Sequence, residues 1–148
     1  MIGIVVLSHG NMASGMIDSV RLLRGEAEGL ESFCLYPHQS VEEFDSGLAD
    51  AIARVDSGEG VLILTDVNGG TPAGRALRIA AARSDIEVVA GVNLPLLLEA
   101  LDAREYSDMD ELCDQLMEVA PHSISCASRV LRKKQDETSK DSLDSIME

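Results

Sequence analysis

The chain has 148 residues, a length expected for one domain built around a single hydrophobic core. It carries 12 Lys and Arg residues against 26 Asp and Glu residues, and the net charge of −14 disfavours binding to nucleic acid or anionic lipid. No run approaches the roughly 20 apolar residues that cross a bilayer, and Met1 leads into no basic leader segment, so we expect a soluble, cytoplasmic protein. Three widely spaced cysteines, Cys34, Cys113 and Cys126, predict neither a disulfide framework nor a zinc site.

The first half of the chain alternates apolar runs with amphipathic segments. Residues 2–7 form the continuous apolar run typical of a strand buried on both faces, and the run ends at Ser8-His9-Gly10. Apolar residues at helical spacing predict a helix over Met12–Arg24, and a strand is expected over Leu30–Tyr36. A Ser-x-x-Glu capping box at Ser40 predicts the start of a second helix.

The same alternation continues through the middle of the chain. A third strand is expected over Val61–Leu64 and ends at Thr65-Asp66. Next comes Gly69-Gly70-Thr71-Pro72, in which we expect Thr71 to cap a helix over Ala73–Arg83 and Pro72 to occupy its first position. A fourth strand is expected over Ile86–Ala90.

Helices dominate the predicted remainder. Pro95 opens a short helix through Leu101, and a further helix is expected over Met109–Ala120, capped by Ser107 or Asp108. Residues Ser123–Val130 are predicted to add a fifth strand. We therefore expect one domain over residues 1–130 and a polar, mobile tail over residues 131–148.

This order of elements predicts an α/β fold with a mostly parallel central sheet and helices on both faces. Ligands in such folds gather at the carboxyl ends of the strands. Three polar segments fall there: Ser8-His9-Gly10, the stretch from Asp66 to Thr71, and Asn93.

His9 and Asp66 are the candidate catalytic pair. A neutral imidazole can attack as a nucleophile through one nitrogen while the other donates to an acceptor that fixes the tautomer, and Asp66 is the natural acceptor. The alternative interpretation makes His9 a structural residue and Asp66 a loop starter. The other two histidines, His38 and His122, follow prolines in expected loops and have no metal-ligand neighbours, so we expect no metal site.

Gly69, Gly70 and Thr71 are the candidate phosphoryl-binding residues. They lack the lysine of a Walker loop and the spacing of a dinucleotide-binding motif, and two glycines before a helix also occur as ordinary turn chemistry. A helix N-terminus beside a threonine hydroxyl nevertheless suits one phosphoryl group, as a phosphohistidine requires. Gly10, Met12 and Asn93 are expected to border this site.

Three motifs in this order, Gly3–Gly10, Gly60–Asp66 with the loop through Pro72, and Gly91-Val92-Asn93-Leu94-Pro95, resemble the mannose-family IIA component of the bacterial phosphoenolpyruvate-dependent sugar phosphotransferase system. The resemblance covers about residues 1–130. It implies that His9 accepts a phosphoryl group from the histidine phosphocarrier protein and passes it to a IIB component, which phosphorylates sugar entering through membrane IIC and IID subunits.

The resemblance also implies roles for individual residues. Asp66 corresponds to the carboxylate that holds the histidine ring, and Thr71 to the hydroxyl residue that faces the phosphoryl group. It implies a homodimer that exchanges a C-terminal edge strand, here Ser123–Val130, and transfer without a cofactor. The chain departs from the family pattern at Asn68 and Ala73, where many members carry larger apolar or aromatic residues.

Two other functions remain compatible with the sequence. The same phosphohistidine chemistry could serve a regulatory module or the phosphoryl-donor subunit of a dihydroxyacetone kinase. A flavodoxin-like binding module without covalent chemistry is the third class, but the chain has no tryptophan and no Ser/Thr-rich phosphate loop.

Overall fold

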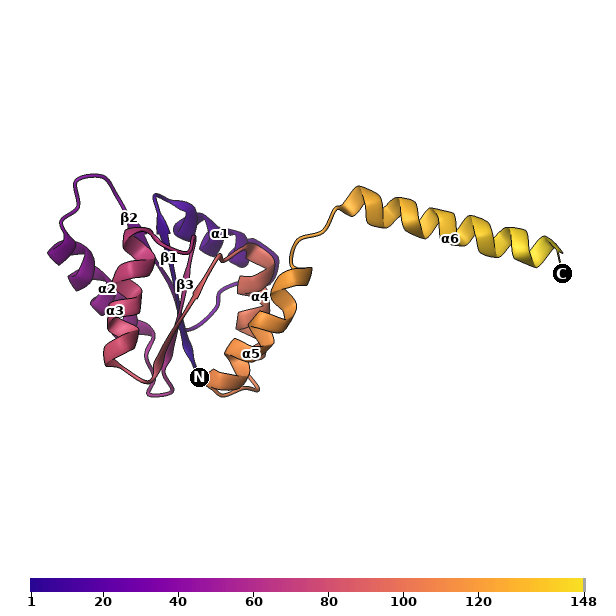
Figure 1. The fold of residues 1–148 in the computed structure, drawn as a ribbon. Coiled ribbons are helices and arrows are strands. Elements are labelled where there is room, and N and C mark those ends of the chain that lie inside the picture. Colours follow the sequence, from indigo (N-terminus) through magenta and orange to yellow (C-terminus); the bar gives the residue numbers. More distant parts are fainter. Residues whose placement is uncertain (148) are drawn as a thin grey trace.

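The computed structural model describes residues 1–147 and shows an α/β domain with one helix projecting from it (Figure 1). Four parallel strands form one sheet in the order β2-β1-β3-β4, which confirms the predicted fold class. The elements are β1 (Gly3–His9), α1 (Met12–Arg24), β2 (Leu30–Leu35), α2 (Val41–Val55), β3 (Val61–Thr65), α3 (Gly70–Ala82), β4 (Ile86–Ala90), α4 (Leu94–Ala103), α5 (Met109–Val119), a 3₁₀ turn η1 (Ala120–His122) and α6 (Ala127–Met147).

Helices cover both faces of the sheet. Alternate β1 side chains point to opposite layers: Ile4 and Val6 belong to the layer of α1, α4 and α5, whereas Val5 and Leu7 belong to the layer of α2 and α3. Because both layers exclude water, β1 and β3 read as continuous apolar runs rather than as alternating ones. This burial fixes the strand register and brings the carboxyl ends of β1 and β3 together at one edge.

The helix starts show which sequence signals were decisive. The Ser40 hydroxyl accepts from the Glu43 backbone N–H at 3.0 Å, so Ser40 caps α2 as expected, but only this half of the expected capping box is formed among the described residues. Asp108, one of the two expected caps of α5, forms a complete capping box with Glu111. The prediction for α3 was wrong, because the helix begins at Gly70 with Gly69 as its cap. Thr71 and Pro72 therefore occupy its second and third positions.

The two glycines explain this early start. Gly69 has φ +99° and Gly70 has φ +78°, values that side chains rarely adopt. The turn that these glycines form begins α3 at Gly70, so Thr71 already lies inside the helix and cannot be its cap.

The predicted strand over Ser123–Val130 is wrong for the single chain. Residues 123–126 form no strand, and α6 begins at Ala127. Its first turns, Ala-Ser-Arg-Val-Leu-Arg-Lys-Lys, lack period-two alternation and are rich in strong helix formers. Residues 131–147, where we predicted a polar tail, lie in this helix, and α6 buries none of its residues.

The chain enters α6 from the carboxyl edge of the sheet. α4 runs from that edge to the amino edge, and α5 runs back beside it (Figure 1). The Asn93 amide donates to the Ser123 hydroxyl at 2.9 Å, and this hydroxyl donates to the Ala120 carbonyl at 2.7 Å. The segment before α6 is thereby tied to the start of α4.

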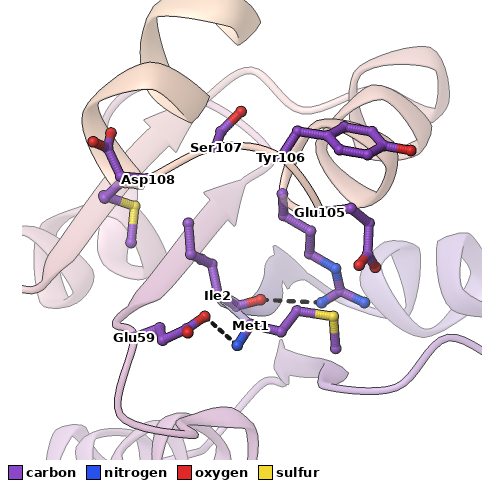
Figure 2. A pocket seen from close by; sticks show the side chains of 9 residues that line it. Met1, Ile2, Glu59, Glu105, Tyr106, Ser107 and Asp108 are labelled. Atoms are coloured by element: carbon purple, nitrogen blue, oxygen red, sulfur yellow. Dashed lines mark hydrogen bonds and ion pairs between the residues drawn. The ribbon is translucent and has the colours of Figure 1, made fainter.

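Arg104 holds the opposite, amino edge together. Its buried guanidinium donates to the carbonyls of Ile2 at 3.1 Å, Gly29 at 3.2 Å and Glu28 at 2.5 Å. Arg104 lines a pocket of 680 Å³. Figure 2 shows the N-terminal ammonium of Met1 paired with Glu59 at this pocket. These contacts join the starts of β1 and β2 to the end of α4, far along the strands from His9.

Candidate active site

The site lies at the carboxyl edge, where β1 and β3 end side by side. His9 is the last residue of β1, and it is paired in register with Leu35 of β2. Asp66 directly follows β3, and its backbone N–H donates to the Leu7 carbonyl at 3.1 Å. Two residues far apart in the sequence are thus placed beside each other by strand pairing alone.

One oxygen of Asp66 binds His9 twice. Oδ2 accepts from the His9 backbone N–H at 2.8 Å and lies 2.8 Å from its ring Nδ1. The other oxygen, Oδ1, accepts from the Val67 backbone N–H at 2.9 Å. The Asp66 side chain is only 10% exposed, whereas that of His9 is 50% exposed. A nearly buried carboxylate thus fixes the orientation of an imidazole ring that solvent can reach.

The charge of Asp66 sets the tautomer of His9. Burial raises the pKa of this carboxyl, but hydrogen bonds from the His9 backbone and ring and from the Val67 backbone outweigh it, and the pKa lies below its ordinary value. An ionised carboxylate only accepts, so Nδ1 must donate. The neutral ring therefore carries its lone pair on Nε2, the nitrogen a nucleophile would use.

The start of α3 lies against this nitrogen. A Cβ added to Gly70 would stand 3.3 Å from His9 Nε2 and 3.2 Å from Cε1, so the Gly70 backbone approaches the ring closely. The first amides of a helix have no acceptors within it and carry the positive end of its dipole. Thr71 is exposed on this first turn. An anionic group bound to Nε2 would therefore lie close to the first backbone amides of α3.

The remaining predicted site residues have different positions. Gly10 follows His9 with φ +56°, and its N–H donates to the Leu35 carbonyl at 2.8 Å. Met12 begins α1 and is 45% exposed at the same edge. Asn93 has a structural task, since its side chain accepts from the Leu96 backbone N–H at 2.9 Å as the cap of α4. No hydrogen bond joins Asn93 to His9 in the described part of the chain.

Tyr36 is a residue at this edge that sequence reasoning missed. It follows β2 and is 49% exposed, and its hydroxyl donates to Asn11 Oδ1 at 2.6 Å. This bond links the loop after β2 to the loop that follows His9. Its position one residue beyond a strand paired with β1 was the available signal.

The loops of this edge are almost free of charge. They comprise residues 8–12, 36–40, 66–69 and 91–93, and Asp66 is the one Asp, Glu, Lys or Arg among them. The exposed side chains around His9 are instead apolar or neutral, including Met12, Tyr36 and Val67. In a chain with net charge −14, this arrangement keeps negative side chains other than Asp66 away from the exposed face of His9, so an anion that approached the ring would meet little repulsion.

The described residues contain no group of three or more His, Cys, Asp or Glu side chains arranged to hold a metal ion. Within residues 1–147, no helix has both the length and the apolar character needed to span a membrane.

Comparison with known proteins identifies the family. The family described as PTS system fructose IIA component, the mannose-type EIIA family, matches residues 3–117. The chain belongs to this family. The match spans β1 through most of α5, including His9 and Asp66.

Individual relatives agree with this assignment. The chain is 35% identical over 119 residues to the mannose-specific EIIAB component of Escherichia coli K12, covering 80% of this chain and 36% of that protein. It thus spans about a third of the length of that relative. It is 28% identical to the fructose-specific EIIA component of Bacillus subtilis, covering 90% of this chain and 91% of the relative.

Solved structures of other phosphotransferase system IIA proteins share this fold. The crystal structure of phosphotransferase system component EIIA from Streptococcus agalactiae superposes with a TM-score of 0.79 at 27% identity, covering 87% of this chain and 99% of that one. The PTS IIA protein associated with the fucose utilization operon of Streptococcus pneumoniae gives a TM-score of 0.74 at 28% identity, with coverages of 87% and 95%.

Proposed function

We propose that this IIA component is a phosphocarrier that accepts a phosphoryl group on His9 Nε2 from the histidine phosphocarrier protein and passes it to a IIB component. The observation that carries the proposal is the pair of hydrogen bonds that His9 makes to one Asp66 oxygen, through its backbone N–H and its ring Nδ1. This arrangement leaves Nε2 free beside the start of α3. Through IIB, the protein would serve sugar uptake by membrane IIC and IID subunits.

The proposed transfer is a direct displacement at phosphorus. The Nε2 lone pair forms the new N–P bond while the donor's N–P bond breaks, and the departing imidazole keeps that electron pair. Phosphorylation leaves the His9 ring with greater positive character, which the Asp66 carboxylate stabilises through Nδ1. The amides at the start of α3 and the Thr71 hydroxyl are proposed to bind the phosphoryl oxygens.

We also infer a homodimer. β2 and β4 are the two edge strands of the sheet, and exposed strand edges favour pairing with another chain. Light scattering on the purified protein tests this inference, and a monomer at all concentrations would contradict it.

The test of the carrier role is intact mass after incubation with phosphoenolpyruvate, enzyme I and the histidine phosphocarrier protein. We expect an acid-labile gain of one phosphoryl group in the wild type and in His38→Ala, but none in His9→Ala. His38 is a matched control because it lies in a loop at the same edge. Absence of the gain in the wild type, with a donor shown to be phosphorylated, would overturn the proposal.

Addition of IIB then tests the second transfer. We expect the phosphoryl group to leave His9 when IIB is added. Transfer to the partner subunits of a dihydroxyacetone kinase, with none to IIB, would instead assign the protein to that kinase.

A further inference from the structure

A serine hydroxyl is buried at the end of β1 where the strand pattern places apolar side chains. Ile4 and Val6 point into the layer of α1, and Ser8 follows them at the same period of two with no exposed surface. A buried hydroxyl is unfavourable unless it is fully hydrogen-bonded. Its presence next to His9 therefore calls for a specific task.

The contacts of Ser8 show that task. Its Oγ accepts from the Ala13 backbone N–H at 2.8 Å and donates to the Gly10 carbonyl at 3.0 Å. Ala13 lies in the first turn of α1, whose cap residue Asn11 makes no side-chain capping bond. Ser8 thus satisfies a free amide of α1 from outside the helix and closes the loop that begins at His9.

This closure acts on the histidine. The segment from His9 to Ala13 is held at one end by the bonds to Asp66 and at the other by the Ser8 hydroxyl. Without the hydroxyl, the Gly10 carbonyl and the Ala13 amide lose their partner, and the backbone carrying His9 gains freedom next to a glycine with φ +56°. The ring would then reach Asp66 less often in the geometry that leaves Nε2 unprotonated.

We propose that Ser8 is a positioning residue for phosphoryl transfer, whose hydroxyl fixes the His9 loop and thereby the Nε2 lone pair. This inference rests on the proposed carrier function for its kinetic consequence. Its structural consequence, the His9 tautomer, is independent of any transfer.

The first measurement is the tautomer of His9, read from the imidazole ¹⁵N shifts of the unphosphorylated protein above pH 8. We expect the wild type, Ser8→Thr and the control Ser14→Ala to carry the hydrogen on Nδ1. Ser14 is matched because its hydroxyl also bonds within this loop, to the Asn11 carbonyl at 2.9 Å, but makes no contact with Ala13 or Gly10. Ser8→Ala is expected to show a mixture of both tautomers.

The second measurement is the rate of transfer from the phosphorylated histidine phosphocarrier protein. We expect kcat to fall at least about tenfold in Ser8→Ala with KM within about twofold, and to recover in Ser8→Thr, since a misplaced nucleophile lowers the rate of the chemical step. Wild-type tautomer and kcat in a folded Ser8→Ala protein would overturn the inference. If that variant does not fold, Ser8→Val replaces it, because valine has the shape of the threonine in Ser8→Thr but no hydroxyl. The same wild-type result there would overturn the inference equally.

The two measurements separate the inference from the carrier role. If no form of the protein accepts a phosphoryl group, the carrier proposal fails while the tautomer comparison still decides the role of Ser8.

Discussion

The Oδ2 atom of Asp66 binds both the backbone N–H and the ring Nδ1 of His9, each at 2.8 Å. A single carboxylate oxygen therefore fixes the main chain of the histidine and the direction of its ring together. This relationship makes the chemistry of His9 depend on one neighbouring side chain.

Replacement of Asp66 by asparagine should slow transfer more than it weakens the fold. The amide keeps the shape of the side chain but removes the charge that favours the Nδ1-protonated ring, so we expect kcat to fall at least about tenfold. The free energy of unfolding should fall by no more than about 2 kcal/mol. Stopped-flow transfer and urea unfolding measure the two effects, and an unchanged kcat would remove Asp66 from the mechanism.

The lowered pKa of Asp66 predicts a specific dependence of stability on acid. The folded pKa lies below the unfolded value of about 3.9, so the stabilising contribution is fully present above that pH and is lost as the pH falls through the folded value. We expect the stability difference between the wild type and Asp66→Asn to be largest near pH 6 and to shrink below pH about 4.

Urea midpoints at a series of pH values check this difference. Asp45 and Asp85, whose pKa values are lowered chiefly by hydrogen bonds from Arg75 and Arg83, contribute equally to both proteins and cancel in the comparison. A difference that grows toward acid would contradict the assignment.

Gly70 and Gly69 form a matched pair for testing the approach of α3 to His9. Both have positive φ, so alanine at either position should cost about 1–2 kcal/mol of stability. A Cβ at Gly70 would crowd Nε2, whereas one at Gly69 meets nothing within 4 Å. We therefore expect a large loss of transfer rate in Gly70→Ala alone. Equal rates in the two variants would show that the contact with the ring does not matter.

Arg104 should matter for stability and not for transfer. Its three carbonyl partners lie at the amino edge, and Arg104→Met leaves them without their buried donor, so we expect a loss of about 2–4 kcal/mol. Arg24→Met is the control, because Arg24 pairs with Asp102 on the surface and should cost less than about 1 kcal/mol. Urea unfolding measures both, and similar values would argue against the role given to Arg104.

Removal of α6 beyond Val130 should leave the domain intact. α6 buries none of its residues, so a chain of residues 1–130 should have a free energy of unfolding within about 0.5 kcal/mol of the full chain. Thermal and urea unfolding compare the two. A marked loss of stability would show that α6 packs against the domain in solution.

The strands, most helices and the pairing of His9 with Asp66 could be predicted because burial on both faces leaves a continuous apolar signature. β1 and β3 are recognisable as such runs, and the carboxyl ends of parallel strands must share an edge. Once His9 and Asp66 fell at the ends of two strands, their proximity followed from topology.

The errors arose where local signals competed. Thr71 and Pro72 match a common helix start, yet the positive φ angles of the two preceding glycines started α3 earlier. The segment after Pro121 was expected to be a strand from its position after the last helix, although its composition favours a helix. The roles of Ser8 and Tyr36 were missed because their hydrogen bonds depend on how the loops of this edge fold, and the periodicity of the sequence does not encode that.

The return of α5 to the carboxyl edge has a consequence for assembly. Because α6 departs from the same edge at which His9 ends β1, a module bound to α6 is tethered on the side of the nucleophile rather than behind the sheet (Figure 1). Tethering replaces diffusion from bulk solution with a local concentration that short linkers raise to the order of millimolar. Binding to the exposed helix α6 would thus raise the rate at which a weakly binding acceptor encounters His9, without any change to the residues around His9.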